Sequence, residues 1–180
     1  MIYITKISVV LPSLNEEKGI GKTIDSINIK YFKKNKWDLE IIIVDGDSKD
    51  KTQEIAKSKG AKVIVEKRKG YGRAYKTGFP KASGDIIVTG DADATYPFEN
   101  IHLYIKKLID ENLDFITTDR FAQLSHGSMS AKHYFGNIIL NLTLRILFFI
   151  KIRDSQSGMW IFKNNALDYI QPLEYFNDGM

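Results

Sequence analysis

The sequence predicts an α/β fold with a mainly parallel sheet covered by helices on both faces. Short runs of β-branched and other apolar residues alternate with longer segments whose apolar residues recur at helical spacing, which is typical of parallel strands joined by crossover helices. The chain has 180 residues, of which 43% are hydrophobic and 27% charged. This length and composition correspond to one globular domain with enough apolar residues for a core.

Each predicted strand is a short apolar run that ends at a turn-forming or polar residue. Pro12 ends the first run, an Asp-Gly-Asp sequence beginning at Asp45 ends the second, and a glycine-rich basic loop from Lys67 to Gly72 follows the third. In chain order, the predicted strands are Ile7–Leu11, Leu39–Val44, Lys62–Val65, Asp85–Thr89 and Leu113–Thr118.

The predicted helices lie between these strands. The first has Ile20, Ile24 and Ile27 at helical spacing, and the last has proline in its first turn, where proline is favoured. Ser48 or Asp50 is expected to cap the second helix. In chain order, the helices are expected over Glu16–Phe32, from that cap to Lys57, near Arg73–Ala82, and over Pro97–Glu111.

Composition narrows the class of protein. The net charge of +4 is compatible with an anionic substrate or a lipid surface, and the chain carries no signature of RNA or DNA binding, so nucleic acid is not an expected partner. The absence of cysteine excludes disulfides, zinc–thiolate sites and thiol nucleophiles, and it fits a reducing compartment. The N-terminal residues lack the apolar segment of a signal peptide.

Polar clusters follow each of the first four predicted strands. The carboxyl ends of parallel strands meet at one edge of a sheet, where ligands bind in folds of this kind. Each cluster alone is explained by a turn or a helix cap, but their coincidence at one edge predicts a ligand site. The clusters are Asn15 with Glu16, Asp45 with Asp47, Arg68–Gly72, and Asp91 with Asp93.

Asp91 and Asp93 are the most informative of these residues. Residues i and i+2 of a strand point to the same face, so persistence of strand geometry would aim both carboxylates at one point. Two like charges that close need a cation between them or raised pKa values. The pair therefore predicts a divalent metal held against a diphosphate, and a strand followed by a polar turn is the structural alternative.

The other clusters also have two interpretations. Asn15 suits a helix N-cap or a ligand contact, and Asp45 suits an Asp-Gly turn or a hydrogen bond to a base or ribose. The basic loop, with Arg68, Gly70 and Arg73, suits a diphosphate or a solvated turn. The chain lacks the glycine-rich motifs of P-loop NTPases and of dinucleotide-binding domains, which argues against both classes.

Five motifs resemble those of family 2 glycosyltransferases, which have the GT-A fold, and within that family those of the dolichyl-phosphate or polyprenyl-phosphate sugar synthases. The motifs are Pro12–Glu17, Val44–Thr52, Arg68–Ala74, Asp91–Pro97 and Asp154–Met159. The order Gly46-Asp47 is swapped relative to the commonest form of the second motif. The resemblance implies a single GT-A (Rossmann-like) catalytic domain over residues 1–180, truncated at its C-terminus.

The resemblance also implies roles for individual residues. Asp91 and Asp93 would bind Mg²⁺ or Mn²⁺ against the donor diphosphate, and they would act in catalysis together with Arg120. The residues implied in binding the acceptor and its phosphate are Arg120, Lys132 and Ser157. The residues implied in binding the nucleotide sugar are Pro12, Ser13, Asn15, Glu16, Asp45, Asp47, Arg68, Gly70 and Asp91.

The implied reaction is metal-dependent transfer of a hexose, with inversion, from a nucleotide-diphosphate sugar (GDP- or UDP-sugar) to a polyprenyl (dolichyl) phosphate. The alternative within the family is a sugar hydroxyl acceptor in glycan or polysaccharide synthesis, for which Asp154 and Asp178 are the candidate general bases. Outside the family, the alternatives are a non-catalytic nucleotide-sugar-binding module and a nucleotidyltransferase, and the latter needs a glycine-rich loop after the first strand that this chain lacks.

Residues Tyr134–Ile152 form a mostly apolar stretch that is interrupted by Arg145 and other polar residues. Arginine at the centre of a membrane-spanning helix is costly, so the stretch predicts a helix that lies on a membrane surface or covers the sheet. A core helix is the alternative, because short apolar runs are ambiguous. With a polyprenyl acceptor, the expected location is the cytoplasmic face of a membrane.

Overall fold

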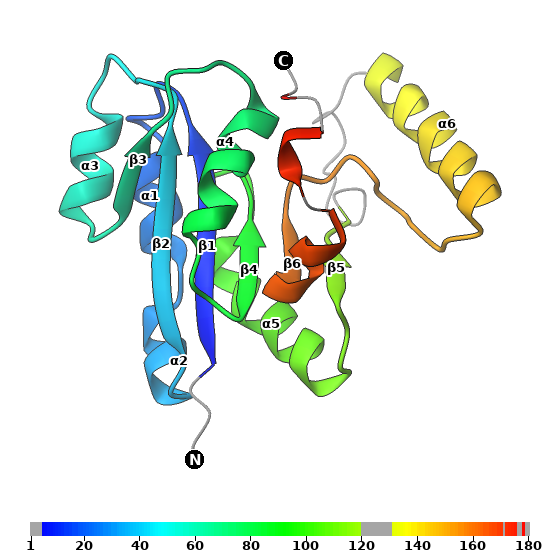
Figure 1. Ribbon diagram of the computed structural model, residues 1–180, viewed down its shortest axis with the longest axis horizontal. Helices are drawn as coiled ribbons and strands as arrows, with labels where there is room; N and C mark the ends of the chain where they lie inside the picture. Colours follow the sequence, from blue (N-terminus) through cyan, green and yellow to red (C-terminus); the bar gives the residue numbers. More distant parts are fainter. Residues whose placement is uncertain (1–4, 120–130, 171, 176–177, 179–180) are drawn as a thin grey trace.

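A computed structural model describes residues 5–119, 131–170, 172–175 and 178 of the chain. Within these residues a six-stranded sheet forms the centre of the molecule, with the strand order β3-β2-β1-β4-β6-β5 (Figure 1). The strands are β1 (Lys6–Ser13), β2 (Asp38–Asp45), β3 (Lys62–Val65), β4 (Ile86–Thr89), β5 (Phe115–Thr117) and β6 (Trp160–Lys163). The α-helices are α1 (Ile20–Ser26), α2 (Ile29–Lys34), α3 (Thr52–Ser58), α4 (Tyr71–Gly78), α5 (Ile101–Asp110) and α6 (Ala131–Phe148).

The sheet is mainly parallel, as predicted. β1 pairs in parallel with β2 and β4, and β2 pairs in parallel with β3. The register sets Ser13 beside Asp45, so the carboxyl ends of β1 and β2 are level. β6, which the sequence analysis did not predict, runs antiparallel between β4 and β5, so the fifth predicted strand pairs with β6 and lies at the edge of the sheet.

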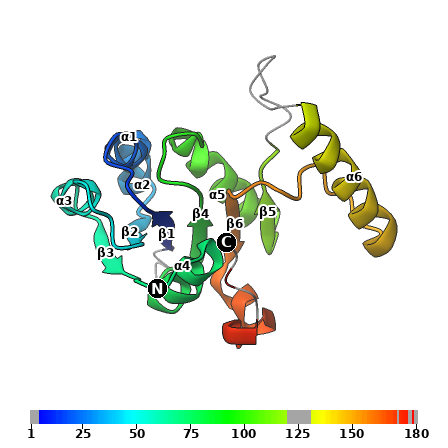
Figure 2. The ribbon, with the colours of Figure 1, turned by 90° about the horizontal axis from the view of Figure 1, so that it is seen from above.

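Helices cover both faces of the sheet, and the alternation along β1 explains why. Val9 and Val10 are both fully buried, but they belong to the cores on opposite faces. The first core packs against α1, α2 and α5, and the second packs against α4 (Figure 2). A central strand buried on both sides reads as the continuous apolar run seen in the sequence.

The predicted helix over residues 16–32 is two helices. Ile27 is extended (φ −65°, ψ 121°) and ends α1, and Asn28 starts α2 by accepting a hydrogen bond from the backbone N–H of Tyr31 at 3.2 Å. The periodicity did not reveal this break because Ile24 and Ile27 are both buried. The first helix begins only at Ile20, so Asn15 is not its N-cap.

The other helix boundaries differ by a few residues. The helix expected near residues 73–82 is α4 followed by a 3₁₀ turn over Phe79–Lys81, and the one expected over residues 97–111 is a 3₁₀ turn over Phe98–Asn100 followed by α5. The residue at the N-cap of α3 is Lys51, and Asp50 Oδ1 accepts the backbone N–H of Thr52 at 3.0 Å. Asp50, rather than Ser48, therefore satisfies a donor at the start of α3.

Helix α6 stands away from the sheet (Figures 1 and 2). Asn141 ties it to the segment before β6, because its Nδ2 donates to the carbonyl of Arg153 at 2.9 Å and its Oδ1 accepts the N–H of Ser155 at 2.9 Å. Large apolar side chains nearby are exposed, including Phe148 (63%) and Phe149 (92%). The core-helix interpretation is therefore wrong, and so is the expectation that this helix covers the sheet. Along the described ranges, none of the helices combines the length and apolar composition needed to cross a membrane.

Gly78 on α4 sets how closely this helix approaches the sheet. A Cβ atom there would lie 2.7 Å from Cγ1 of Val10 and 2.8 Å from Cγ2 of Val44. We expect Gly78→Ala to lower the free energy of unfolding by about 1–3 kcal/mol, because overpacking forces the helix or the two valines to shift. Urea denaturation measures the change. Gly136→Ala is the control: a Cβ there meets nothing within 4 Å, so no loss is expected, and a loss equal to that of Gly78→Ala would contradict the account.

Candidate functional site

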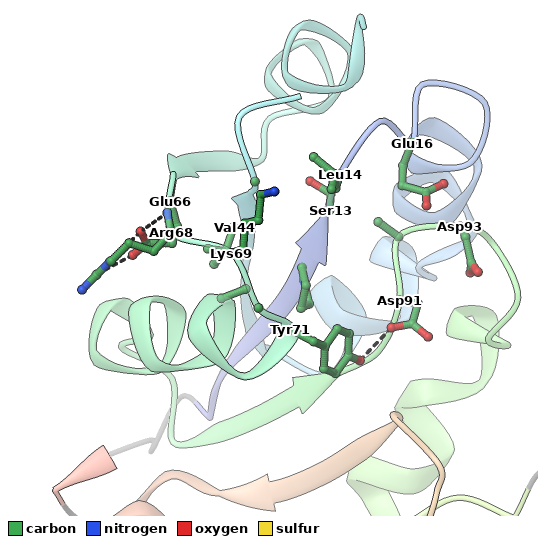
Figure 3. A pocket seen from close by; sticks show the side chains of 15 residues that line it. Ser13, Leu14, Glu16, Val44, Glu66, Arg68, Lys69, Tyr71, Asp91 and Asp93 are labelled. Carbon is green, nitrogen blue, oxygen red and sulfur yellow. Dashed lines mark hydrogen bonds and ion pairs between the residues drawn. The ribbon is translucent and has the colours of Figure 1, made fainter. Parts of the chain in front are cut away.

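A pocket of about 530 Å³ opens at the carboxyl ends of the parallel strands, where the sequence predicted a ligand site (Figure 3). Loops after β1, β2, β3 and β4 all contribute to its wall. The lining includes several residues that the sequence analysis assigned to the donor or the metal, namely Pro12, Ser13, Glu16, Arg68, Gly70, Asp91 and Asp93.

The acidic side of the pocket carries Glu16, Asp91 and Asp93 (Figure 3). Partial burial raises the pKa of Glu16, and the negative charges of Asp93, Asp50 and Asp91 raise it further. Negative charges that raise the pKa of a neighbouring carboxyl group in this way favour a bound cation. In the described part of the chain, no group of three or more His, Asp or Glu side chains forms a metal-ligand set.

A turn, rather than the strand itself, presents the acidic pair. β4 ends at Thr89, yet exposure still alternates beyond it: Ala92 is 2% exposed, whereas Asp91 is half-buried and Asp93 is exposed. The buried Thr23 of α1 fixes this turn: its hydroxyl donates to the carbonyl of Ala92 at 3.1 Å and accepts the N–H of Ala94 at 3.0 Å. Thr23 therefore holds Asp91 and Asp93 at the pocket.

Each acid also has a local hydrogen bond. Asp93 Oδ1 accepts the backbone N–H of Thr95 at 2.9 Å and its hydroxyl at 2.7 Å. Asp91 Oδ1 accepts the phenol of Tyr71 at 2.7 Å (Figure 3). Burial raises the pKa of Tyr71, and the neighbouring Tyr75 and Asp91 raise it further, so this phenol stays protonated and remains a donor.

Asp45 is fully buried, and the chain itself satisfies its carboxylate. Oδ1 accepts the N–H of Ser48 at 2.8 Å and Nε2 of Gln53 at 2.7 Å, and Oδ2 accepts the hydroxyls of Ser48 at 2.5 Å and Ser13 at 3.1 Å. Its neighbours Val44 and Gly46 line the pocket. This network joins the ends of β1 and β2, so Asp45 shapes the pocket wall from behind.

Asn15 holds the two neighbouring loops together, and Asp47 pairs with a lysine of its own loop. Both adopt positive φ angles, 55° and 66°. Asn15 Oδ1 accepts the N–H of Lys49 at 2.8 Å, and its own N–H donates to the hydroxyl of Ser48 at 2.9 Å. Asp47 forms an ion pair with Lys49 at 2.6 Å, which lowers the pKa of Asp47. A nucleotide contact by either residue stays a prediction.

Arg68 and Glu66 lie on the side of the pocket opposite the acids (Figure 3). Arg68 Nε donates to Glu66 Oε1 at 2.9 Å and Nη2 donates to Oε2 at 2.6 Å, while the hydroxyl of Thr77 also donates to Oε2 at 2.6 Å. These hydrogen bonds lower the pKa of Glu66 to about 2. A contact between Arg68 and a diphosphate therefore stays a prediction. Such a contact would compete with the ion pair between Arg68 and Glu66.

Arg73 and Asp178 pair with each other. Arg73 Nη2 lies 2.9 Å from Asp178 Oδ1, and Nη1 lies 2.9 Å from Glu174 Oε1. Lys76 Nζ lies 2.6 Å from the same Asp178 oxygen, and the hydrogen bond from Lys76 is the largest cause that lowers the pKa of Asp178. Arg73 thus binds two acidic side chains of its own chain, Glu174 and Asp178, and the lowered pKa makes Asp178 a weaker general base.

The acceptor residues are only partly described. Arg120 and the side chain of Lys132 lie outside the described residues. Ser157 is 1% exposed, and its hydroxyl lies 2.8 Å from that of Thr118, so this hydroxyl is part of the interior. Asp154, the other candidate base, is also 1% exposed, and its Oδ1 accepts the N–H of Gln156 at 3.0 Å.

The sequence model of the family described as "Glycosyl transferase family 2" matches residues 8–170. The chain therefore belongs to glycosyl transferase family 2. This confirms the predicted family, and the sheet with its helices confirms the predicted fold class.

Two curated relatives of this family 2 domain come from Haloferax volcanii. The low-salt glycan biosynthesis hexosyltransferase Agl6 is 36% identical over 165 residues, which cover 89% of this chain and 39% of that protein. A dolichyl-phosphate hexose transferase is 30% identical over 174 residues, which cover 97% of this chain and 72% of that protein. The chain thus spans less than half the length of the first relative.

The fold is similar to that of a GT-A glycosyltransferase of known structure. The crystal structure of glucosyl-3-phosphoglycerate synthase from Mycobacterium tuberculosis in complex with Mn²⁺ and UDP-glucose matches with a TM-score of 0.70 at 26% identity. The match covers 91% of this chain and 57% of that one.

Sequence reasoning missed three residues of this family 2 site: Thr23, Glu66 and Tyr71. Thr23 follows Ile20 by three residues and lies on the buried face of α1, where a polar residue needs a partner. Glu66 directly follows β3, at the same edge as the predicted clusters, and that position was the signal available. Tyr71 lies between the two glycines of the basic loop, and nothing local in the sequence indicates its contact with Asp91.

Proposed function

We propose that this family 2 domain transfers a hexose, with inversion, from a nucleotide-diphosphate sugar to a polyprenyl (dolichyl) phosphate, with the help of a divalent metal ion. The observation that carries the proposal is the pocket at the carboxyl edge of the sheet, with Asp91 and Asp93 in its wall. The relative named dolichyl-phosphate hexose transferase, which aligns with 97% of this chain, supports a lipid phosphate as the acceptor.

The two sides of the pocket differ in a way that suits a nucleotide sugar. Pro12, Leu14 and Val44 give one part of the wall apolar surface that suits a base, and we assign the cation and the diphosphate to the part of the wall that carries Asp91 and Asp93. The mycobacterial structure with the same fold was determined with Mn²⁺ and UDP-glucose. We therefore propose a UDP- or GDP-sugar as the donor.

The residues present fit a hard divalent cation. Mg²⁺ and Mn²⁺ prefer oxygen ligands, and Mg²⁺ is commonly held by one or two carboxylates together with substrate phosphates. Asp91 and Asp93 would be those carboxylates, and Glu16 adds negative potential beside them. When bound, the metal supplies charge neutralisation for the departing diphosphate. The chain contributes the fixed turn, which Thr23 holds in place.

A phosphate acceptor agrees with the surroundings of the two candidate general bases, which suit neither of them for deprotonating a hydroxyl. A phosphate is anionic at neutral pH and needs positioning rather than deprotonation, whereas a hydroxyl acceptor needs a general base. The ion pairs of Asp178 make it a poor base, and Asp154 is buried. We assign the positioning of the acceptor phosphate to Arg120 and Lys132.

Helix α6 supports a membrane location for this reaction. Its exposed apolar side chains form a surface of the kind that lies in the interface of a lipid bilayer, where a polyprenyl chain is also anchored. Ile146, Leu147 and Phe148 are each more than 60% exposed. We propose that the domain works at the cytoplasmic face of a membrane, with α6 against the lipid.

The test is a transfer assay with two acceptors. The protein is incubated with Mn²⁺, a radiolabelled UDP- or GDP-hexose, and either a polyprenyl phosphate in detergent or a soluble sugar. We expect label in the organic phase with the polyprenyl phosphate, and EDTA should remove it. Transfer only to the soluble sugar would contradict the acceptor, and transfer unchanged by EDTA would contradict the metal.

A further inference from the structure

Tyr71 connects the first residue of α4 to the acidic turn after β4. Its phenol donates to Asp91 Oδ1 at 2.7 Å, and both side chains border the pocket (Figure 3). The two residues come from different loops, so the bond joins the basic loop after β3 to the turn that carries Asp91 and Asp93.

The phenol of Tyr71 is supported from inside the core. Its oxygen lies 3.1 Å from that of Tyr75. A phenol has one hydrogen to donate, and an ionised carboxylate can only accept, so Tyr71 donates its hydrogen bond to Asp91 and accepts one from the Tyr75 hydroxyl. Tyr75 is 5% exposed, and its ring stacks on Phe79 at 5.1 Å between centroids. A chain of hydrogen bonds therefore runs from the core to Asp91.

Gly158 limits the movement of Tyr71 from the other side. A Cβ atom at Gly158 would lie 3.0 Å from the Tyr71 hydroxyl and 3.1 Å from that of Tyr96. The N–H of Gly158 donates to Tyr96 at 2.8 Å, and its carbonyl accepts the hydroxyl of Thr89 at 2.8 Å, at the end of β4. The Tyr71 hydroxyl thus lies between α4, the end of β4 and the segment before β6, while the residue as a whole is 41% exposed.

We propose that Tyr71 is a positioning residue that orients the Asp91 carboxylate, so that Asp91 and Asp93 present their oxygens to one divalent cation. This inference rests on the proposed function, in which Asp91 is a metal ligand. Hydrogen bonds from neighbouring groups to metal ligands fix the orientation of those ligands, and their loss weakens metal affinity by about 10- to 100-fold. The hydrogen bond from the Tyr71 hydroxyl to Asp91 Oδ1 is the contact that would perform this role.

The test is a Mn²⁺ titration in the presence of UDP, in which electron paramagnetic resonance measures the free ion. Tyr71→Phe keeps the ring and removes only the hydroxyl, and we expect it to weaken Mn²⁺ binding about 10-fold or more. At saturating Mn²⁺, the kcat of Tyr71→Phe should differ from that of the wild type by a smaller factor than its Mn²⁺ affinity does. Tyr104→Phe, on α5, is the matched control and should leave the affinity unchanged.

Gly158→Ala provides a second variant. Its added Cβ presses on the Tyr71 hydroxyl, so it should weaken Mn²⁺ binding in the same direction while Tyr71 stays in place. A Tyr71→Phe affinity within twofold of the wild type, with the wild type binding Mn²⁺ more tightly than Asp93→Asn, would overturn this inference alone. Equal, weak binding by the wild type and Asp93→Asn would overturn the metal site, and the role of Tyr71 with it.

Discussion

Replacing Asp93 with asparagine is expected to lower kcat/KM for hexose transfer by about 100-fold or more while the protein stays folded. Asp93 is exposed at the pocket, and an asparagine Oδ1 can still accept the two hydrogen bonds from Thr95. The change therefore removes a negative charge and a metal ligand but keeps the turn. Losing one group that stabilises transition-state charge typically costs 10²- to 10³-fold in kcat.

The comparison needs initial rates over a range of Mn²⁺ concentrations and a thermal unfolding curve for each protein. Asp110→Asn is the matched control, because Asp110 lies at the end of α5 and pairs with Lys106 on the helix surface. The control should keep wild-type rates. An Asp93→Asn protein with a rate within threefold of the wild type would show that the carboxylate takes no part in transfer.

Replacing Asp45 with alanine is expected to lower the free energy of unfolding by about 3–5 kcal/mol, because it removes the one acceptor that several polar donors share. The carboxylate is fully buried and accepts four hydrogen bonds, from Ser13, from Gln53 and twice from Ser48. Alanine leaves these donors without an acceptor, and each buried unsatisfied group costs about 1–3 kcal/mol.

Urea denaturation without any ligand measures this effect, so it does not depend on the proposed reaction. Asp38→Ala, at the other end of β2, removes a carboxylate that is 60% exposed and should change stability by less than about 1 kcal/mol. A similarly small change for Asp45→Ala would mean that the network is weak. Asp45 would then be explained better as a ligand of the nucleotide, as the family resemblance implies.

Much of the fold follows from local patterns in the sequence. β1, β2 and β4 have continuous apolar runs because most of their residues are buried on both faces, and the parallel order of β1 to β4 follows from the helices between them. β6 could not be predicted in the same way. In its pairing with β4, Ile161 lies beside Val88, and the local sequence around either residue does not indicate a partner so far away along the chain.

The candidate site likewise has features that the sequence predicts and contacts that it does not. Topology alone brings the loops after β1 to β4 to one edge, so the pocket could be located from the order of the strands. The partners of each side chain could not be predicted. Arg68 pairs with Glu66 and Arg73 pairs with Asp178, because these side chains meet only after folding. Asp45 likewise receives a hydrogen bond from Gln53, a residue of α3 that reaches it only after folding.

The most direct test of the central claim, that Asp91 and Asp93 hold a divalent cation against the donor diphosphate, is anomalous diffraction from crystals grown with Mn²⁺ and UDP. The account predicts a manganese peak beside the carboxylates of Asp91 and Asp93, with the diphosphate on its other side. A peak at another place in the molecule, with nucleotide density outside this pocket, would contradict it.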